Sequence, residues 1–486
     1  MSDFRADHLT AGNSRQPTVP APSAVAICLI AMVLLLPLML GDRTPEAMTN
    51  SGLMLLLLAF LATLLAWRAA GREFLSRQPL LPTRGWWLVF ALMSLTVLMQ
   101  VLPLGFLARW FGPYPDAFWS NALFEPRFWS PNPAASLRGW AVFVGLFTVA
   151  WLAGSLDRRQ RNWVWLALAL SALFQASYGM LSHFLQAETI FGIWERRSLS
   201  SPQGSFSNRN LFAAYLALTW PLAVAVWWRR EMPLLARLPK ELRVTGSMVS
   251  AALIGTAIFA SASRLSSMAA LVGAIAALLL LTRYRGRMPN IVAWPAWTAL
   301  AATFLLAVWV GLEPLTERLA ISEADGYRRI AFELMLRDLP LAWWLHGVGL
   351  GGFEAVFRLV QPDQIGGWWD YAHSDVLQWL LEMGLVGALL AGLVAAALIK
   401  NARLSLERIP LYGGLFAMLT VATADFSWHM PATQVVLAIY IGVLLQPARN
   451  GHRKGARGRH EKVDEGRPVR RRRRRRSGGL RQDLLN

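Results

Sequence analysis

Three basic side chains, far apart in the sequence, stand out because each lies close to a long apolar run. Arg264 separates two apolar stretches, Arg328 lies in a polar segment, and His373 comes just before an apolar run of more than twenty residues. The guanidinium of arginine is a planar fork of donors that binds phosphate oxygens in pairs and stays charged at any relevant pH. Two arginines at the edge of a membrane therefore suit a diphosphate, whose growing charge they could stabilise as a bond to it breaks.

Arg264 also has a simpler interpretation, because a long basic side chain at a helix end can reach the lipid headgroups. Excess arginine is expected on the inner side of a membrane, however, and the topology given below puts Arg264 on the outer side. We therefore favour an anion-binding role for Arg264.

Arg328 is singled out by its place on a helix that we predict over residues 322–338. Three charged residues of this helix recur at a spacing of four and should form one solvated stripe: Arg329, Glu333 and Arg337. Arg328 lies off this stripe, where Asp325 is the acidic residue that could pair with it. Arg328 is therefore the arginine that we expect to meet a group from outside the helix.

His373 could act as a general base on a hydroxyl, because the pKa of histidine lies near neutrality. It could instead bind the diphosphate, or simply bond a loop carbonyl at the start of the next helix. Ser374 and Asp375 are expected to cap that helix rather than to take part in chemistry. Glu382 lies in the apolar run itself, where it serves either polar pairing between helices or function.

Metal and cofactor sites are not predicted. His183, His346 and His429 include no pair at the i, i+4 spacing of a helical metal site, and Cys28 is the only cysteine. The glycines between residues 347 and 352 lack the spacing of a phosphate-binding loop.

The elements that must position these side chains are membrane helices. The chain of 486 residues is 55% hydrophobic and 16% charged, whereas soluble proteins carry about 25% charged residues. Its apolar runs approach the length of about 20 residues that a helix needs to cross a bilayer. We predict an all-α polytopic membrane protein with about 12 transmembrane helices, whose cores are residues 25–40, 53–67, 86–104, 137–154, 163–181, 211–228, 247–262, 268–282, 291–311, 376–399, 411–424 and 433–445.

The basic residues of the short loops predict the orientation. Alternate loops carry most of the Lys and Arg, and these loops belong on the cytoplasmic side. Both termini are then cytoplasmic, and three longer loops face outward: 105–136, 182–210 and 312–371. The largest of these outward loops lies between helices 9 and 10.

This topology predicts three regions. A disordered cytoplasmic tail covers residues 1–23, and a transmembrane domain covers residues 24–446, including the outward loop 312–373. A basic, disordered cytoplasmic tail covers residues 447–486. The last tail holds much of the net charge of +19, with seven consecutive arginines from Arg470 to Arg476. We interpret it as a solvated segment near anionic lipid rather than as a site for nucleic acid or an acidic partner. No nucleic-acid partner is predicted.

Several short stretches of the sequence follow one another in an order that is typical of one protein family. GSFSNRNLFAAYLALTWPLA begins at Gly204, Ser263–Arg264 closes the seventh predicted helix, HGVGLGGFEAVF begins at His346, AHSDVLQWLLEMGLVG at Ala372 and DFSWHMPAT at Asp425. With an arginine in the large loop, the order of these stretches over residues 103–446 resembles that of the O-antigen ligase and polymerase family of bacterial membrane glycosyltransferases. The arginine tail departs from the family pattern.

The resemblance implies a multi-pass protein of a bacterial inner membrane, with the large outward loop in the periplasm. It also implies an inverting, metal-independent transfer of a glycan from an undecaprenyl-diphosphate carrier to a hydroxyl at the periplasmic face. It implies Arg264, Arg328 and His373 as catalytic residues. We add Asn208, Arg209, Asn210 and Tyr371 as substrate-binding residues. Arg209 is a basic residue that many ligases lack at this place, and it can mark a polymerase-like subgroup.

The acceptor stays open at this stage. Lipid A-core would make the protein an O-antigen ligase of lipopolysaccharide synthesis, a growing glycan would make it a polymerase, and a protein serine would make it an oligosaccharyltransferase. The rival from another class is a transporter or flippase of a polyprenyl-linked glycan. Transporters keep ionisable groups near mid-membrane, and Glu382 is the residue that favours this alternative.

Overall fold

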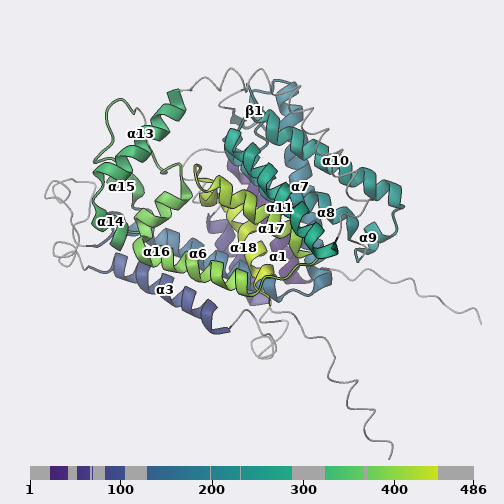
Figure 1. Cartoon of the computed structure of the whole chain (residues 1–486), viewed down its shortest axis with the longest axis horizontal. Helices are drawn as coiled ribbons and strands as arrows, with labels where there is room; N and C mark the ends of the chain where they lie inside the picture. Colours follow the sequence, from purple (N-terminus) through teal and green to yellow (C-terminus); the bar gives the residue numbers. More distant parts are fainter. Residues whose placement is uncertain are drawn as a thin grey trace, which may run out of the picture. The chain divides into compact units, whose positions relative to one another are not determined.

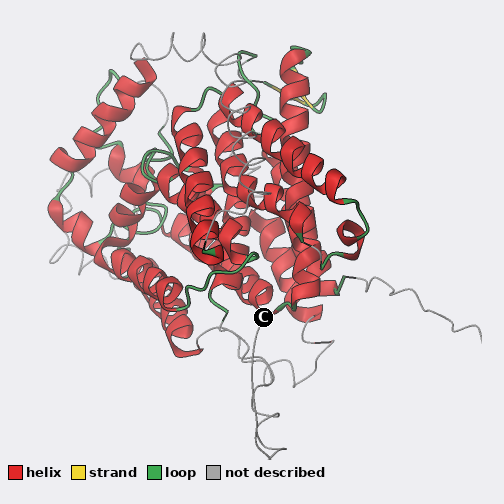
Figure 2. Cartoon of the chain, turned by 45° about the vertical axis from the view of Figure 1, so that its right-hand side comes forward, coloured by secondary structure: helices red, strands yellow, loops and turns green. Residues whose placement is uncertain are grey.

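Helices make up nearly all of the regular structure in a computed structural model of the chain (Figures 1 and 2). It describes residues 22–41, 52–65, 68, 83–103, 128–196, 199–229, 231–286, 323–365 and 369–446. Among these residues, six helices are long and apolar enough to cross a membrane: α6 (Pro133–Ser155), α7 (Arg158–Phe184), α8 with its 3-10 extension η2 (Arg209–Ala225 and Val226–Trp228), α10 (Lys240–Ala260), α11 (Arg264–Arg285) and α16 (Asp375–Lys400). The chain is thus a helical membrane protein by length and composition.

Shorter apolar helices accompany these six. They are α1 (Ala24–Leu35) with the 3-10 segment η1 (Leu36–Gly41), the helix Gly52–Leu65, α3 (Thr83–Val101), α17 (Arg408–Val421) and α18 (Pro431–Leu444). Eleven of the predicted cores coincide with these helices and the six long ones, and the core at 291–311 lies outside the described residues. The number of membrane crossings stays a prediction. The tails 1–21 and 447–486 also lie outside the described residues.

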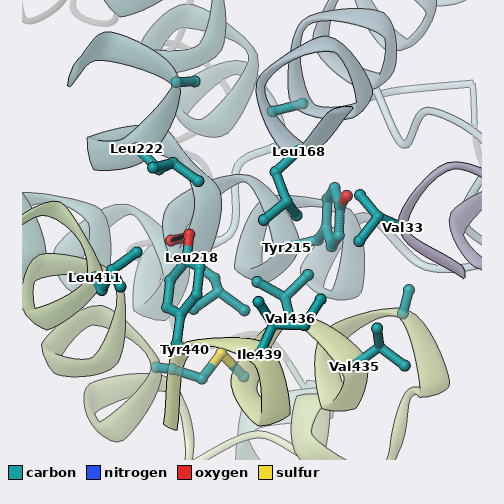
Figure 3. Close-up of a cluster of buried hydrophobic side chains, with 14 of the residues drawn as sticks. Val33, Leu168, Tyr215, Leu218, Leu222, Leu411, Val435, Val436, Ile439 and Tyr440 are labelled. Atoms are coloured by element: carbon teal, nitrogen blue, oxygen red, sulfur yellow. Dashed lines mark hydrogen bonds between the residues drawn. The ribbon is translucent and has the colours of Figure 1, made fainter. Parts of the chain in front are cut away.

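Helix α8 lies at the centre of the largest apolar core. It contacts α7, α10, α11 and α17, and nearly all of its side chains are buried. The hydroxyl of Tyr215 on α8 lies 2.7 Å from Ser171 Oγ, and the hydroxyl of Tyr440 on α18 donates to Leu218 O at 3.4 Å. Figure 3 shows both tyrosines among the surrounding aliphatic side chains. Each buried hydroxyl therefore has a partner, as burial among apolar groups requires.

Small residues let some of these helices approach closely, which is how helices associate inside a bilayer. Helices α11 and α17 cross at Gly273 and Gly413, where a Cβ on Gly273 would lie 2.6 Å from Gly413 O. A side chain at this crossing would force the two helices apart.

A second apolar core forms outside the main bundle, in the segment predicted as the largest outer loop. Helices α13 (Glu323–Asp338), α14 (Leu341–His346) and α15 (Phe353–Phe357) pack together and against α16. We call these three helices the α13–α15 cluster; they lie beside α16 in Figure 1. Helix α13 confirms the helix predicted over residues 322–338.

Helix α16 is broken at Gly384, a feature that the sequence did not predict. The backbone there has φ 58° and ψ −149°, which only glycine adopts readily. The break frees two carbonyls, and the glycine-rich turn satisfies them: Val348 N donates to Leu381 O at 2.9 Å, and Gly349 N donates to Glu382 O at 3.0 Å. The turn after α14 therefore attaches the α13–α15 cluster to the first half of α16 through two backbone hydrogen bonds.

A minor departure from the all-α prediction lies between α7 and α8. Strands β1 (Thr189–Ile190) and β2 (Trp194–Glu195) form a two-residue antiparallel pair. Arg196 follows β2 and donates to the carbonyls of Ser182, Ala187 and Ser201, so that this buried guanidinium holds the connection in place.

Candidate functional site

The loop before α16 and the turn after α17 meet at one end of the bundle. Asp375 N donates to Asp425 O at 3.0 Å, and Val376 N donates to Ala422 O at 3.3 Å. The 3-10 turn η3 (Ser427–His429) continues from there to α18. We call this region the His373 end; it brings together residues separated by about fifty positions in the sequence.

His373 lies between two aromatic rings, with centroid distances of 4.9 Å to Trp369 and 5.0 Å to Phe426. Its φ of +53° is unusual for a residue with a side chain. Nδ1 is buried and accepts or donates no hydrogen bond within the described part of the chain. Burial, together with the charge of Arg328, lowers the pKa of His373 to about 3. The expected pKa near neutrality is therefore wrong, because the sequence does not show that the ring is enclosed.

Arg328 is half-buried on α13, whereas the side chain of Arg329 is 82% exposed and bonds Glu333 at 2.8 Å. The choice of Arg328 as the residue directed inward is thus consistent with the fold. Its charge acts on His373 and also on Asp425, whose pKa is raised by burial against the opposing effect of Arg328. The charged stripe is confirmed only between Arg329 and Glu333, because Arg337 bonds Asp338 instead.

Asp375 does not cap α16, contrary to the sequence-based expectation. Ser374 alone does so, with its hydroxyl accepting from Leu377 N at 3.3 Å. The Asp375 carboxylate instead accepts from Trp428 N at 2.9 Å and contacts His429 Nδ1 at 2.7 Å. Asp375 is only 2% exposed, and η3 brings the two donors to it.

Tyr371 stacks on Phe426 with a centroid distance of 4.8 Å and also contacts the ring of His429 at 5.0 Å. Burial raises the pKa of Tyr371 above its usual value, so the phenol stays protonated at neutral pH. Tyr371, predicted to bind substrate, thus borders His429 and shares the ring of Phe426 with His373.

Arg264 begins α11, one residue after the N-cap Ser263, and is half-buried. Ser266 Oγ, in the first turn of the same helix, donates to Asn210 O at 3.4 Å. Asn208 is the N-cap of α8. Its side-chain oxygen Oδ1 accepts from Asn210 N at 2.7 Å, so this oxygen already has a structural role. The starts of α8 and α11 therefore bring Arg264 together with the predicted residues 208–210.

The two groups of predicted residues adjoin each other through α8. This helix contacts α11 and also contacts η3, which carries His429. The charge of Arg328 lowers the pKa of His373, so these two side chains lie near each other. Arg264 is connected to them only indirectly, because its helix α11 contacts α8, and α8 contacts η3. The antiparallel packing of α11 and α17 puts the start of α11 toward the His373 end, while of the three predicted catalytic residues only Arg328 and His373 are seen to act on each other.

Glu382 is buried, and among the described residues its carboxylate is bonded within its own helix and by the start of α15 rather than by another membrane helix. Gln378 Nε2 donates to Glu382 Oε1 at 3.0 Å, and Phe353 N donates to the same oxygen at 3.3 Å. Gln378 Oε1 in turn accepts from Ala372 N at 3.0 Å. Glu382 therefore helps to fix the loop residue that precedes His373.

No three His, Cys, Asp or Glu side chains lie close enough to hold a metal ion among the residues that the structure describes. Comparisons of the chain with protein-family models, with curated proteins and with solved structures found no match. The site must therefore be interpreted from its own geometry.

Proposed function

We propose that this protein is a membrane glycosyltransferase that moves a glycan from an undecaprenyl-diphosphate carrier to a hydroxyl acceptor. The observation that carries the proposal is the buried Nδ1 of His373, which has no hydrogen-bond partner in the described part of the chain and lies within the electrostatic reach of Arg328. A buried polar atom left without a partner in a native fold is a place where a ligand can bind. Arg264 lies at the same end and extends the site toward α8 and α11.

Each residue has a distinct role in this proposal. Arg264 and Arg328 hold the diphosphate and stabilise its charge as the bond to the sugar breaks. His373, whose pKa is lowered to about 3, is a weak proton acceptor, so it serves as a hydrogen-bond donor that aligns the diphosphate rather than as a base. A bound diphosphate would also oppose the field of Arg328 at the ring.

We place the His373 end at the outer face of a bacterial inner membrane. Support comes from the opposite end of the bundle, where the starts of α7 and α17 bring basic side chains together: Arg158, Arg161, Arg229, Arg403 and Arg408. Basic residues concentrate on the cytoplasmic side of membrane proteins. Cysteine-labelling of single positions on each side of the membrane in intact cells would test this orientation.

A substitution series in the producing bacterium tests the function. Arg264→Ala, Arg328→Ala and His373→Ala should each deplete the surface glycan while protein levels hold, and Arg329→Ala is the matched exposed control. If all three variants at the site leave the glycan unchanged, the assignment is wrong.

The acceptor can be identified from the glycan that a deletion strain accumulates. Single repeat units would indicate loss of a polymerase, unlinked long chains would indicate loss of a ligase, and a protein without its sugar would indicate an oligosaccharyltransferase.

The broken helix α16 favours a second candidate, a flippase of a polyprenyl-linked glycan, because transporters use discontinuous helices at their substrate sites. The break adjoins Glu382, the buried acid of that helix. Movement of a labelled glycolipid across liposomes that contain the protein, without glycan transfer, would favour this candidate over the glycosyltransferase.

A further inference from the structure

The two histidines of the His373 end are both half-buried, but they differ in their partners. The ring of His373 lies between Trp369 and Phe426, and its buried Nδ1 has no hydrogen-bond partner in the described part of the chain. The side chain of His429 is 31% exposed, and its Nδ1 lies 2.7 Å from Oδ1 of the buried Asp375. A carboxylate can only accept, so Nδ1 of His429 carries the proton, and Nε2 of the neutral ring is left as an acceptor.

We infer that His429 is the general base of the proposed transfer and that Asp375 is the residue that positions it. The inference rests on the proposed function and identifies where the proton of the acceptor hydroxyl goes. A histidine whose Nδ1–H is held by a buried carboxylate has a fixed tautomer and ring orientation, which are what a base of this kind needs.

The balance of the step is simple. The oxygen of the acceptor hydroxyl forms a bond to the anomeric carbon of the donor sugar, and its proton passes to Nε2 of His429. The bond between that carbon and the diphosphate oxygen breaks, and its electron pair leaves with the undecaprenyl diphosphate. His429 then carries a positive charge next to Asp375 until the proton is released to water.

The turn that carries His429 is built to hold this pair. Trp428 N donates to Oδ2 of Asp375 at 2.9 Å, while His429 uses Oδ1, so both carboxylate oxygens are engaged. Asp425 fixes the start of the same turn by accepting from Phe426 N at 2.9 Å and from Ser427 Oγ at 3.2 Å. Tyr371 packs against the ring of His429 at 5.0 Å.

The proton affinities of the two histidines support the same assignment. Burial alone would lower the pKa of His429, but the hydrogen bond and charge of Asp375 outweigh burial and raise it above its usual value. His373, whose pKa is lowered to about 3, is a poor proton acceptor by comparison.

Asp375 and Glu382 act on the charge of His429, and both favour the charged ring. Four further charged or titratable groups belong to the His373 end and bear on a pH experiment there: Asp425, Tyr371, His373 and Arg328. Arg209 begins α8, which contacts the turn that carries His429.

The test uses the full-length protein in nanodiscs with a synthetic undecaprenyl-diphosphate glycan and a hydroxyl acceptor. Rates are measured against pH for the wild type, for His429→Gln and for the matched variant His373→Gln. Binding of the donor in the absence of acceptor is measured separately. His429→Gln should slow transfer by about a hundred-fold to ten-thousand-fold, remove the acid limb of the pH profile and leave donor binding unchanged. His373→Gln should weaken donor binding and keep the acid limb.

Asp375→Asn provides an independent variant. Its amide would donate to Nδ1 and force the proton onto Nε2, so the rate should fall at least about tenfold, and the acid limb of the remaining activity should move to lower pH. Added imidazole should restore part of the activity of His429→Ala, which a purely structural role would not allow.

The inference is overturned if His429→Gln keeps the wild-type rate and acid limb, or if imidazole rescues His373→Ala instead of His429→Ala. A failure of the proposed function gives a different result, because the wild-type protein would then transfer no glycan to any acceptor class.

Discussion

Two polar clusters lie at opposite ends of α17, and they are built on different principles. At the start of the helix, the carboxylate of Glu407 meets Arg161 at 2.9 Å, Arg229 at 3.3 Å and the indole of Trp165 at 3.1 Å. Burial raises the pKa of Glu407, but the two arginines outweigh burial and lower it to about 2. We call this the Glu407 cluster, and its carboxylate is fully engaged.

The His373 end, beyond the other end of α17, is less complete. Nδ1 of His373 has no partner in the described part of the chain, and His429 has one nitrogen held and its ring partly open. Both clusters contain groups with a shifted pKa, but the shift of Glu407 comes from ion pairs, which hold elements of a fold together. A histidine with one nitrogen left to accept a proton is instead typical of a functional site. The comparison therefore assigns stability to the Glu407 cluster and chemistry to the His373 end.

The largest expected effect is on stability, at the Glu407 cluster. Glu407→Gln removes the negative charge between Arg161 and Arg229 and leaves two buried cations facing each other. Breaking a buried pair in this way costs about 3–5 kcal/mol. Thermal unfolding in nanodiscs should show a much lower midpoint, while transfer per folded molecule stays the same. If Glu407→Gln kept the wild-type unfolding midpoint but lost transfer activity, Glu407 would serve the reaction rather than the stability of the fold.

The acid sensitivity of the fold should trace to the same carboxylate. The pKa of Glu407 falls from 4.5 to about 2 on folding, so its contribution is present above about pH 4.5 and is lost as the pH falls toward 2. A shift of this size corresponds to about 3 kcal/mol. The unfolding midpoint should therefore drop between pH 4.5 and pH 2.5 in the wild type and change less in Glu407→Gln. Equal slopes for the two proteins would contradict this prediction.

At the His373 end, the expected effect is on rate. Arg328→Ala should reduce transfer by about a hundred-fold or more, comparable to removing one donor that stabilises a transition state. The unfolding midpoint should hardly change, because Arg328 is only half-buried. Initial rates and unfolding curves from the same preparation make this measurement, and a loss of stability without a loss of rate would speak against the assignment.

The smallest effect is expected one residue away. Arg329→Ala removes an exposed i, i+4 pair with Glu333, and such pairs contribute little. Both the rate and the unfolding midpoint should match those of the wild type. A loss of activity here would show that α13 presents its other face to the substrate.

Much of the helical framework could be predicted from the sequence, because long apolar runs and basic loops are local features. Arg328 could also be distinguished from Arg329 by spacing alone. The contact between Asp375 and His429 could not, because it joins residues 54 positions apart through a turn that has no local signature. The low pKa of His373 was missed for a related reason: the rings that enclose it, Trp369 and Phe426, come from separate segments.

The break in α16 bears on how this protein can vary. The attachment of the glycine-rich turn to Leu381 and Glu382 uses peptide groups, Val348 N and Gly349 N, rather than side chains. Most side chains near these two hydrogen bonds could be substituted without breaking the bonds. The condition is that Gly347, Gly349 and Gly384 keep their positive φ angles. The side chains of the α13–α15 cluster are thus free to change while the backbone keeps the cluster attached to α16.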